Sequence, residues 1–338
     1  MHIVSLDDET PAELLKSWHE LRATTDLELE PNVPPPGFDE AFAHVISNGL
    51  FDRRGWLLVE SGAVVAYVLV EFPKLDNPQL AELELRVDAV HRRSGNATRL
   101  LQLAAQAASD AGRRSILVEA VEGSAGDKAC AALGAKSALG STSSALRLTD
   151  LDQSLVENWI ARRGERAEAY SLVRWIDHCP DDLVDQCVPL LNAMNTAPMG
   201  DLDLTIDWSP DSIRASELAH LNADRRSYVV CARHDATGEL VALTHVLVPQ
   251  GRPTLGVQED TVVRPDHRER GLGRWIKAEM LLWLARDEPQ LDQIITWNAT
   301  ENAAMRGINT ELGFVAGDAW TERQFSTADL LAELARRK

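Results

Sequence analysis

The chain has 338 residues, of which 45% are hydrophobic and 25% charged, and its formal net charge is −18. This length exceeds the size at which one hydrophobic core usually stops growing, so two domains are expected. The negative charge disfavours nucleic acid and anionic membrane surfaces as partners, because either polyanion would be repelled. The longest apolar stretch, Ala63 to Val70, is too short to span a bilayer and no secretory signal opens the chain, so we expect a cytoplasmic protein.

The four cysteines are spread through the chain without a Cys-x-x-Cys pair: Cys130, Cys179, Cys187 and Cys231. This spacing argues against a disulfide framework and against a zinc site. We therefore expect reduced, mostly buried thiols and no bound metal.

The first half of the chain has the periodicity of a mixed α/β domain. The expected elements are, in chain order, a strand at 2–5, helices at 11–22 and 37–47, strands at 56–59, 64–71 and 83–87, a helix at 97–108, a strand at 115–120 and a short helix that ends at Gly134.

The second half repeats this order. Its expected elements are a strand at 170–175, helices at 180–194 and 209–221, strands at 228–233, 241–248 and 261–263, a helix at 273–285, a strand at 293–297 and a helix that ends at Gly313.

A constant offset supports the repeat. The segment Val87–Ala97 aligns without a gap on Val263–Gly273, so that Arg92 falls on Arg268, 176 residues later. The same offset places Arg147 on Arg323, and a helix-like tail follows each of them. We therefore predict two copies of one fold, residues 1–150 and 170–338, joined by a polar linking helix within 151–169.

Both copies carry Arg-x-x-Gly-x-Gly/Ala between a strand and a helix. The free amides of a helix's first turn and the partial positive charge there favour an anion such as a diphosphate, and glycine lets it approach the backbone. A single such match is also compatible with a simple tight turn, but here the match occurs twice in the same context. The sequence lacks the Gly-Lys-Ser/Thr of a nucleotide-binding loop, and the motif does not open the chain as a dinucleotide fingerprint would.

At these residues the sequence resembles the GNAT acetyltransferase family. The run Val263–Gly273 is similar to the acyl-CoA pyrophosphate arm of that family, and Val87–Ala97 resembles a second copy of it. The segments Asn298–Asn302 and Leu312–Phe314 are similar to the family's later motif beside the pantetheine. The layout of the whole chain is similar to that of mycothiol-synthase-like tandem GNATs and of the tandem acetyltransferases of clavulanic acid gene clusters.

The resemblance implies an α/β (α+β) fold of two tandem GNAT domains, each a mixed, mostly antiparallel twisted sheet flanked by helices. It implies direct transfer of an acyl group from acetyl-CoA, or another acyl-CoA, to the amine of a small molecule, in antibiotic or other secondary-metabolite biosynthesis. The cofactor contacts that it implies are Val87, Asp88, Ala89, Arg92, Arg93, Ser94, Gly95, Asn96, Ala97 and Thr98 in the first copy, and Val263, Arg268, Arg270, Gly271, Leu272, Gly273, Arg274, Asn298 and Asn302 in the second.

The candidate catalytic bases are carboxylates on the strand that leads into the second turn, Asp260 and Glu259. Alternation along a strand places these neighbours on opposite faces, so we expect only one of them, preferably Asp260, to face the acyl group. Glu82 and Glu84 hold comparable positions in the first copy. Exposed strand charges or structural ion pairs remain the alternative for each carboxylate.

The sequence departs from the family where the resemblance implies a tyrosine as general acid. Asn309 occupies that position in the second copy and Cys130 in the first, and neither is an acid at neutral pH. This departure leaves three readings open: an acyltransferase with the second copy catalytic, a CoA-binding protein without catalysis, and an aminoglycoside- or peptide-type defence acetyltransferase. The sequence does not set the oligomeric state, and a monomer is compatible with it.

Several other residues have structural interpretations. Asn298-x-x-Glu301 is typical of a helix capping box. His91 and His267 are expected to be solvated turn residues. The second-copy tryptophans are expected in the core: Trp275, Trp283 and Trp297.

Overall fold

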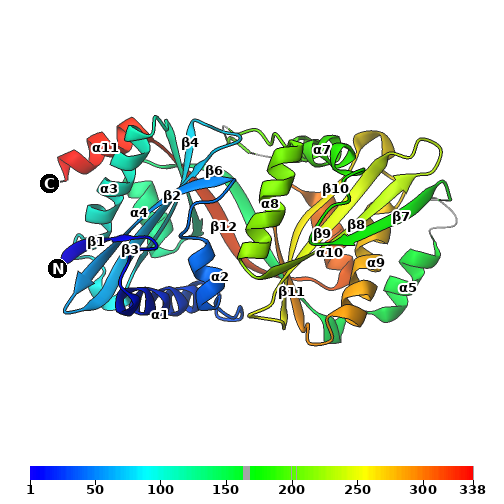
Figure 1. Cartoon of the computed structure of the whole chain (residues 1–338), viewed down its shortest axis with the longest axis horizontal. Coiled ribbons are helices and arrows are strands. Elements are labelled where there is room, and N and C mark those ends of the chain that lie inside the picture. The colour runs from blue at the N-terminus through cyan, green and yellow to red at the C-terminus, as the bar shows by residue number, and fades with distance from the viewer. Residues whose placement is uncertain (163–167, 199, 203, 338) are drawn as a thin grey trace. The chain divides into compact units, whose positions relative to one another are not determined.

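The computed structural model describes residues 1–162, 168–198, 200–202 and 204–337 (Figure 1). The chain forms two compact units. Unit 1 comprises Met1–Gly140, Gly200–Thr205 and Ala319–Lys338, and unit 2 comprises Ser141–Met199 and Ile206–Asp318.

Unit 1 is a sheet with a helical layer on each face. Its strands lie in the order β1 (His2–Leu6), β2 (Phe51–Glu60), β3 (Ala63–Pro73), β4 (Leu80–Val87), β5 (Ser115–Val121) and β12 (Val315–Ser326). One face carries α1 (Ala12–Leu29) and α2 (Phe38–Ala43), and the other carries α3 (Asn96–Asp110), α4 (Ala125–Ala132) and α11 (Thr327–Arg336). Helices α3 and α11 pack together although they are far apart in the sequence (Figure 1).

Unit 2 repeats this architecture. Its strands lie in the order β6 (Lys136–Arg147), β11 (Gln293–Ala299), β10 (Leu255–Val263), β9 (Leu240–Pro249), β8 (Arg225–His234) and β7 (Tyr170–Ile176). The two closing strands cross the unit bounds, because residues 136–140 of β6 belong to unit 1 and residues 315–318 of β12 belong to unit 2. Helices α5 (Gln153–Ala161) and α9 (Leu272–Asp287) cover one face, α7 (Val184–Asn192) and α8 (Pro210–Asn222) cover the other, and α10 (Ala303–Leu312) follows β11.

The two units exchange their closing strands. Strand β12, at the end of the chain, pairs antiparallel with β5 from Trp320 opposite Val121 to Ser326 opposite Ser115. Strand β6 instead pairs antiparallel with β11 of unit 2. The predicted linear boundaries, 1–150 and 170–338, do not anticipate this exchange. Pattern alone cannot reveal it, because Arg147 and Arg323 occupy equivalent positions in strands that serve opposite units.

Each sheet is antiparallel except for one short parallel pair. Strand β4 pairs with β5 at Leu80, Ala81 and Glu82, and β10 pairs with β11 at Leu255, Gly256 and Val257. Beyond these residues the two parallel strands part, and each sheet has a fork there. The predicted fold class, a mixed and mostly antiparallel sheet flanked by helices, is confirmed.

Most predicted elements are present with shifted ends. The first helix is longer than expected and runs to Leu29, whereas the helix expected at 180–194 begins only at Val184. The expected linking helix is α5, Gln153–Ala161, and residues 163–167 of that segment lie outside the described residues.

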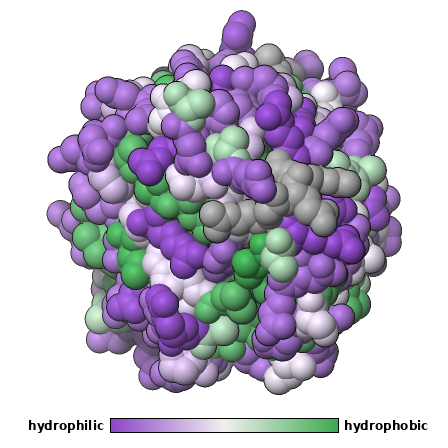
Figure 2. Space-filling model, turned by 90° about the vertical axis from the view of Figure 1, so that its right-hand side faces the viewer, coloured by the Kyte–Doolittle hydropathy of each residue, from purple (hydrophilic) through white to green (hydrophobic). Residues whose placement is uncertain are grey.

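The described helices include none that is long and apolar enough to cross a membrane. Figure 2 shows one face of unit 2, where hydrophilic side chains cover most of the surface and hydrophobic ones form short patches.

The exchange predicts that substitutions in α11 destabilise unit 1. Leu330 is 1% exposed in the unit 1 core, so Leu330→Ala should lower the stability of unit 1 by about 2–5 kcal/mol. Hydrogen exchange should show faster exchange in α3 and β5. Leu218→Ala is the matched control, because Leu218 is 55% exposed on α8. Equal effects of the two variants would contradict the assignment of α11 to the unit 1 core.

Candidate functional site

The turn between β10 and α9 has a defined, partly left-handed backbone. Glu269 and Gly271 have φ values of 63° and 77°. The guanidinium Nε of Arg268 donates to the carbonyl oxygen of Val263 at 3.1 Å, which closes the turn. The turn between β4 and α3 repeats this geometry: Arg93 and Gly95 have φ values of 60° and 81°, and Arg92 Nε donates to the Val87 carbonyl at 3.0 Å.

Both turns leave the first amides of a helix without a side-chain cap. The N-cap residues of α3 and α9 are Gly95 and Gly271, and neither has a side chain to accept from them. By contrast, side chains cap five other helices: α4, α5, α8, α10 and α11. A Cβ built on either glycine would meet nothing within 4 Å, so space lies open beside the backbone. These open helix starts fit a diphosphate group.

The arginines of the second turn are engaged both within the turn and by neighbouring elements of unit 2. Arg270 Nη1 donates to the hydroxyl of Tyr170 at 2.9 Å, and that hydroxyl lies 2.8 Å from His267 Nδ1. Arg274 makes a bidentate ion pair with Glu311, and Arg268 also donates to the Thr196 hydroxyl. The prediction that His267 is a solvated turn residue is wrong, because its imidazole is 8% exposed and packs against Tyr170.

The first turn is the more open of the two. Arg92 pairs with Glu28, while Arg93, Ser94, Ala97 and Arg99 are exposed. Asn96 is buried and donates to the His91 carbonyl, so its side chain stabilises the turn. His91 itself lies between two carboxylates, Asp88 and Glu60.

Several residues of unit 2 were predicted to cap a helix or to lie in the core. Asn302, not Asn298, caps α10, so the capping box predicted at Asn298 is wrong. Asn298 instead accepts a hydrogen bond from Asn309 Nδ2 at 2.7 Å. Trp275 and Trp283 are buried as predicted, but Trp297 is 36% exposed at the end of β11.

A β-bulge sits in β10 at the fork of unit 2. Gln258 lies opposite Val246 and Thr261 opposite Thr244, so that Glu259 and Asp260 together face the single residue His245. The side chains of Gln258 and Thr261 both contact the Thr244 hydroxyl, which places these two residues on one face. Strict alternation therefore fails at the bulge, and the expectation that Glu259 and Asp260 lie on opposite faces does not apply there.

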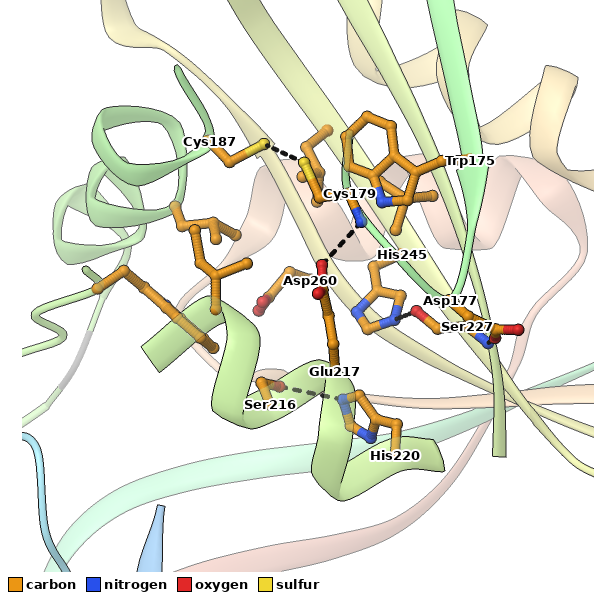
Figure 3. Close-up of a pocket in the computed structure, with 15 residues that line it drawn as sticks. Trp175, Asp177, Cys179, Cys187, Ser216, Glu217, His220, Ser227, His245 and Asp260 are labelled. Atoms are coloured by element: carbon orange, nitrogen blue, oxygen red, sulfur yellow. Dashed lines mark hydrogen bonds between the residues drawn. The ribbon is translucent and has the colours of Figure 1, made fainter. Parts of the chain in front are cut away.

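The face of unit 2 under α7 and α8 contains a cavity of about 70 Å³ (Figure 3). Asp260 lines it, together with both rings of the pair His220 and His245 and the indoles of Trp175 and Trp208. Among the described residues, none donates a hydrogen bond to the Asp260 carboxylate. The other lining carboxylates are engaged: Asp177 accepts from the Ser227 amide at 2.8 Å, and Glu217 pairs with Arg214.

Burial sets the protonation states around this cavity. It raises the pKa of Asp260, and together with the charge of Asp260 it raises the pKa of Glu259 to about 7. Glu259 touches solvent and lies outside the cavity, so water screens its charge more than that of Asp260. Burial also lowers the pKa of His220 to about 4 and that of His245 to about 3, so both imidazoles are neutral at physiological pH.

In unit 1 the carboxylate that corresponds to Asp260 is that of Glu84, and it lies in an ionic network. Glu84 lies opposite Leu69, as the bulge residues lie opposite His245, but its strand has no bulge. It accepts from the Tyr67 hydroxyl and pairs with Arg22 and Arg86. Burial alone would raise its pKa, but the two guanidinium charges and this hydrogen bond outweigh burial and lower it to about 2. Glu84 is therefore a poor proton acceptor.

A buried polar chain supports the fork of unit 2 from the α9 side. Lys277 Nζ donates to Gln258 Oε1 at 3.0 Å, and the Thr296 hydroxyl donates to the Gln258 carbonyl at 3.1 Å. Burial lowers the pKa of Lys277 to about 7. The Thr296 bond joins β11 to β10 just where their backbone pairing ends, and the Lys277 bond ties β10 to α9.

Comparisons with known proteins agree with this architecture. Residues 17–134 match the model of the acetyltransferase (GNAT) family. A tandem GNAT protein from the clavulanic acid biosynthesis pathway is 25% identical, with a TM-score of 0.80 over 96% of this chain and 98% of that one. The chain thus has the fold of a tandem GNAT protein, and the match of residues 17–134 supports an acyltransferase.

Two further solved structures share this fold. A GCN5-related N-acetyltransferase from Sphaerobacter thermophilus is 13% identical with a TM-score of 0.67, covering 96% of both chains. A glucosamine N-acetyltransferase region of a fungal multi-domain β-N-acetylglucosaminidase is 13% identical with a TM-score of 0.66, covering 96% of this chain and 38% of that one. No curated protein sequence gives a match.

Sequence reasoning missed several residues of the candidate site. The two histidines and two tryptophans of the cavity come from α8, β9, β7 and the segment before α8, and no motif links them. His245 had one signal: Thr244-His245 interrupts an otherwise apolar strand, which is the usual mark of a polar site in a buried sheet.

Unit 1 has a row of carboxylates whose charge should make its stability depend on pH. Glu71 lies opposite Glu82, and Glu119 lies opposite Glu322. Burial and the neighbouring carboxylates raise the pKa of Glu82 to about 7. A carboxyl whose pKa is raised in the fold favours folding below its unfolded pKa, and this stability is lost as the pH rises through the folded value.

Glu82→Gln should therefore stabilise unit 1 by about 1–3 kcal/mol at pH 8, with little effect at pH 4. Thermal unfolding followed at both pH values measures this difference. Glu122→Gln, on an exposed site beyond β5, should change the stability little at either pH. A destabilised Glu82→Gln protein at pH 8 would show that the ionised carboxylate is a favourable structural partner.

Proposed function

We propose that this protein transfers an acyl group from acetyl-CoA, or another acyl-CoA, to an amine of a small cationic molecule, and that unit 2 carries the reaction. One observation supports this division most directly. The bulge carboxylate Asp260 is half-buried, unpaired among the described residues and faces a cavity, whereas its counterpart Glu84 is locked between Arg22 and Arg86.

The cofactor's diphosphate is proposed to bind at the open helix starts. In unit 2 the first-turn amides after Gly271, with Leu272, Gly273 and Arg274, would hold it, and Val263 lies at the strand end beside the fork. A Cβ on Gly273 would lie 3.6 Å from Ile308, so a larger residue there would crowd the space between α9 and α10. When bound, the cofactor supplies an activated thioester whose carbonyl the amine attacks.

The amine is proposed to bind in the cavity as a cation that then loses a proton. An alkylamine with a pKa near 10 is mostly protonated at neutral pH, so a base must accept a proton before attack. Asp260 is the proposed base because its raised pKa brings it closer to the operating range. Trp175 and Trp208 offer aromatic faces to a cation, and Glu259 adds negative charge nearby.

The departing thiolate is proposed to leave without a proton donor. Asn309 is 3% exposed and donates to Asn298, and an amide does not supply a proton at neutral pH. A thiol pKa of about 8.5 makes the thiolate a good leaving group by itself. The active-site residues therefore need to assist only the amine.

Unit 1 is proposed to bind an acyl-CoA without turning it over. Its turn has the same backbone geometry around Gly95, including the uncapped helix start. Its carboxylate Glu84 has a pKa of about 2, far below the range of a useful base. We therefore favour a structural role for an acyl-CoA bound at the first turn, with Arg92, Arg93 and Thr98 around it.

The biosynthetic setting is proposed from one structural likeness. The protein with a TM-score of 0.80 over nearly its whole length belongs to the clavulanic acid pathway. We propose that this chain likewise acts in the biosynthesis of an antibiotic or another secondary metabolite.

A charge placed at the second turn should abolish cofactor binding there. Gly271 has a left-handed φ of 77°, which Asn and Asp tolerate better than other side chains. Gly271→Asp should reduce the affinity of unit 2 for acetyl-CoA at least about tenfold, a change of 1.4 kcal/mol or more, because its carboxylate faces the diphosphate. Gly271→Asn, of the same shape without the charge, should retain most of the affinity.

Native mass spectrometry with added acetyl-CoA separates the two turns. Gly95→Asp tests the first turn in the same way, and the double variant should bind none. Wild-type binding by Gly271→Asp would contradict the placement of the diphosphate.

Loss of the bulge carboxylate should remove amine activation. Asp260→Asn should lower kcat/KM by about 10²–10⁴, the usual contribution of a general base, with acetyl-CoA affinity unchanged. Activity of the wild type should rise with pH as the carboxyl ionises. The assay follows free thiol released from acetyl-CoA with a library of small amines.

Glu82→Gln serves as the control, because it removes another carboxyl of raised pKa from the equivalent strand of unit 1 and should leave the pH profile unchanged. If Asp260→Asn retains wild-type kcat/KM, the base lies elsewhere. If the wild type releases no thiol with any amine, the acyltransfer proposal for this cavity fails.

A further inference from the structure

The cavity of unit 2 contains a close pair of thiols that the proposed acyl transfer does not use. Cys179 Sγ lies 3.6 Å from Cys187 Sγ. Both cysteines line the cavity, and the two sulfurs point toward one another (Figure 3). Each side chain is only 2% exposed, so the cavity is the route by which a small molecule reaches them.

The backbone holds the first cysteine firmly in place. Cys179 lies in the loop between β7 and α7, where its amide donates to Glu217 Oε1 at 2.8 Å. Its carbonyl accepts from Arg214 Nη1 at 2.8 Å. Glu217 and Arg214 are themselves paired on α8, so the loop is clamped from one side. Cys187 lies in the first turns of α7, eight residues further along the chain.

We propose that Cys179 and Cys187 form an oxidisable dithiol that closes to a disulfide when a hydroperoxide enters the cavity. A disulfide needs a sulfur separation of about 2.05 Å. The sulfurs must therefore approach by about 1.5 Å, a movement that side-chain rotation supplies. The cavity of about 70 Å³ admits a peroxide-sized molecule, since a water needs only about 10–15 Å³ of such space.

The two thiols are suited to different steps of the reaction. Hydrogen bonding from Cys187 lowers the pKa of Cys179, and the same contact raises the pKa of Cys187. Cys179 is thus the attacking thiolate and Cys187 the resolving thiol. Cys231 is completely buried in the same core cluster but does not line the cavity.

The reaction balances with one peroxide. The Cys179 thiolate attacks one peroxide oxygen, the O–O bond breaks, and the departing hydroxide takes a proton and leaves as water. The Cys187 sulfur then attacks the sulfenic sulfur of Cys179, the S–S bond forms, the S–O bond breaks, and the hydroxyl leaves with the Cys187 proton as a second water. Two thiols are oxidised and one peroxide is reduced to two waters.

The closing experiment counts thiols in the full chain before and after treatment with hydrogen peroxide. Titration of the unfolded protein should fall from four free thiols to two, and the intact mass should fall by about 2 Da, the two thiol hydrogens that close a disulfide. Peptide mapping should join the peptides that hold Cys179 and Cys187, and dithiothreitol should restore all four thiols. Oxidised glutathione, too large for the cavity, should react at least about tenfold more slowly than peroxide at equal concentration, because thiol exchange needs access to the sulfur.

Matched variants identify the pair. Cys179→Ala and Cys187→Ala should each form no internal disulfide, whereas Cys231→Ala and Cys130→Ala should form it as the wild type does. Circular dichroism confirms that each variant is folded, and the wild-type measurement needs no variant at all. Four thiols after peroxide treatment, a cross-link that includes Cys231, or faster oxidation by glutathione disulfide would overturn the proposal. None of these readouts depends on acyl transfer.

Discussion

The parting of two parallel strands is the constraint on which the rest of unit 2 depends. Strands β10 and β11 pair through only three residues, and beyond Val257 the backbone groups that face the gap need other partners. The Thr296 hydroxyl supplies one such partner to the Gln258 carbonyl, and Lys277 holds the Gln258 side chain from α9. This buried polar chain ties β10 to β11 and to α9 just past the last backbone pair of the two strands.

The two units place a carboxylate at the same strand position of one fold, but in two different environments. Both have a fork, a closing arginine and a left-handed glycine at the helix start. In unit 1 a regular strand directs a single glutamate into a network with Arg22 and Arg86, which satisfies the charge and fills the space. In unit 2 one additional residue makes a bulge in β10. The carboxylate of Asp260 lines a cavity there, whereas Glu84 contacts two arginines at the same position of unit 1. A single insertion in a strand therefore separates a structural ion pair from a candidate base.

The sequence was most informative where local backbone geometry determines function. The glycine turns could be predicted because only certain residues accept a left-handed φ, and the offset of 176 residues located both of them. The bulge could not be predicted, since Glu259 and Asp260 look like any alternating pair until their register with β9 is known. The strand exchange was equally hidden, because pairing partners far apart in sequence leave no periodic signal. His267 and Trp297 were misjudged for the same reason: their burial depends on Tyr170 and on the end of β11, which are distant in the chain.

The exchange of closing strands also constrains how the protein is made. Strand β12 and α11 are made after all of unit 2, yet Phe325, Leu330 and Leu334 belong to the core of unit 1. The core of unit 1 therefore remains incomplete until β12 and α11 are made, with the edge of β5 and an apolar surface on α3 uncovered in the meantime. Unit 1 cannot complete its core from the first half of the chain alone, as the first domain of an ordinary two-domain protein does.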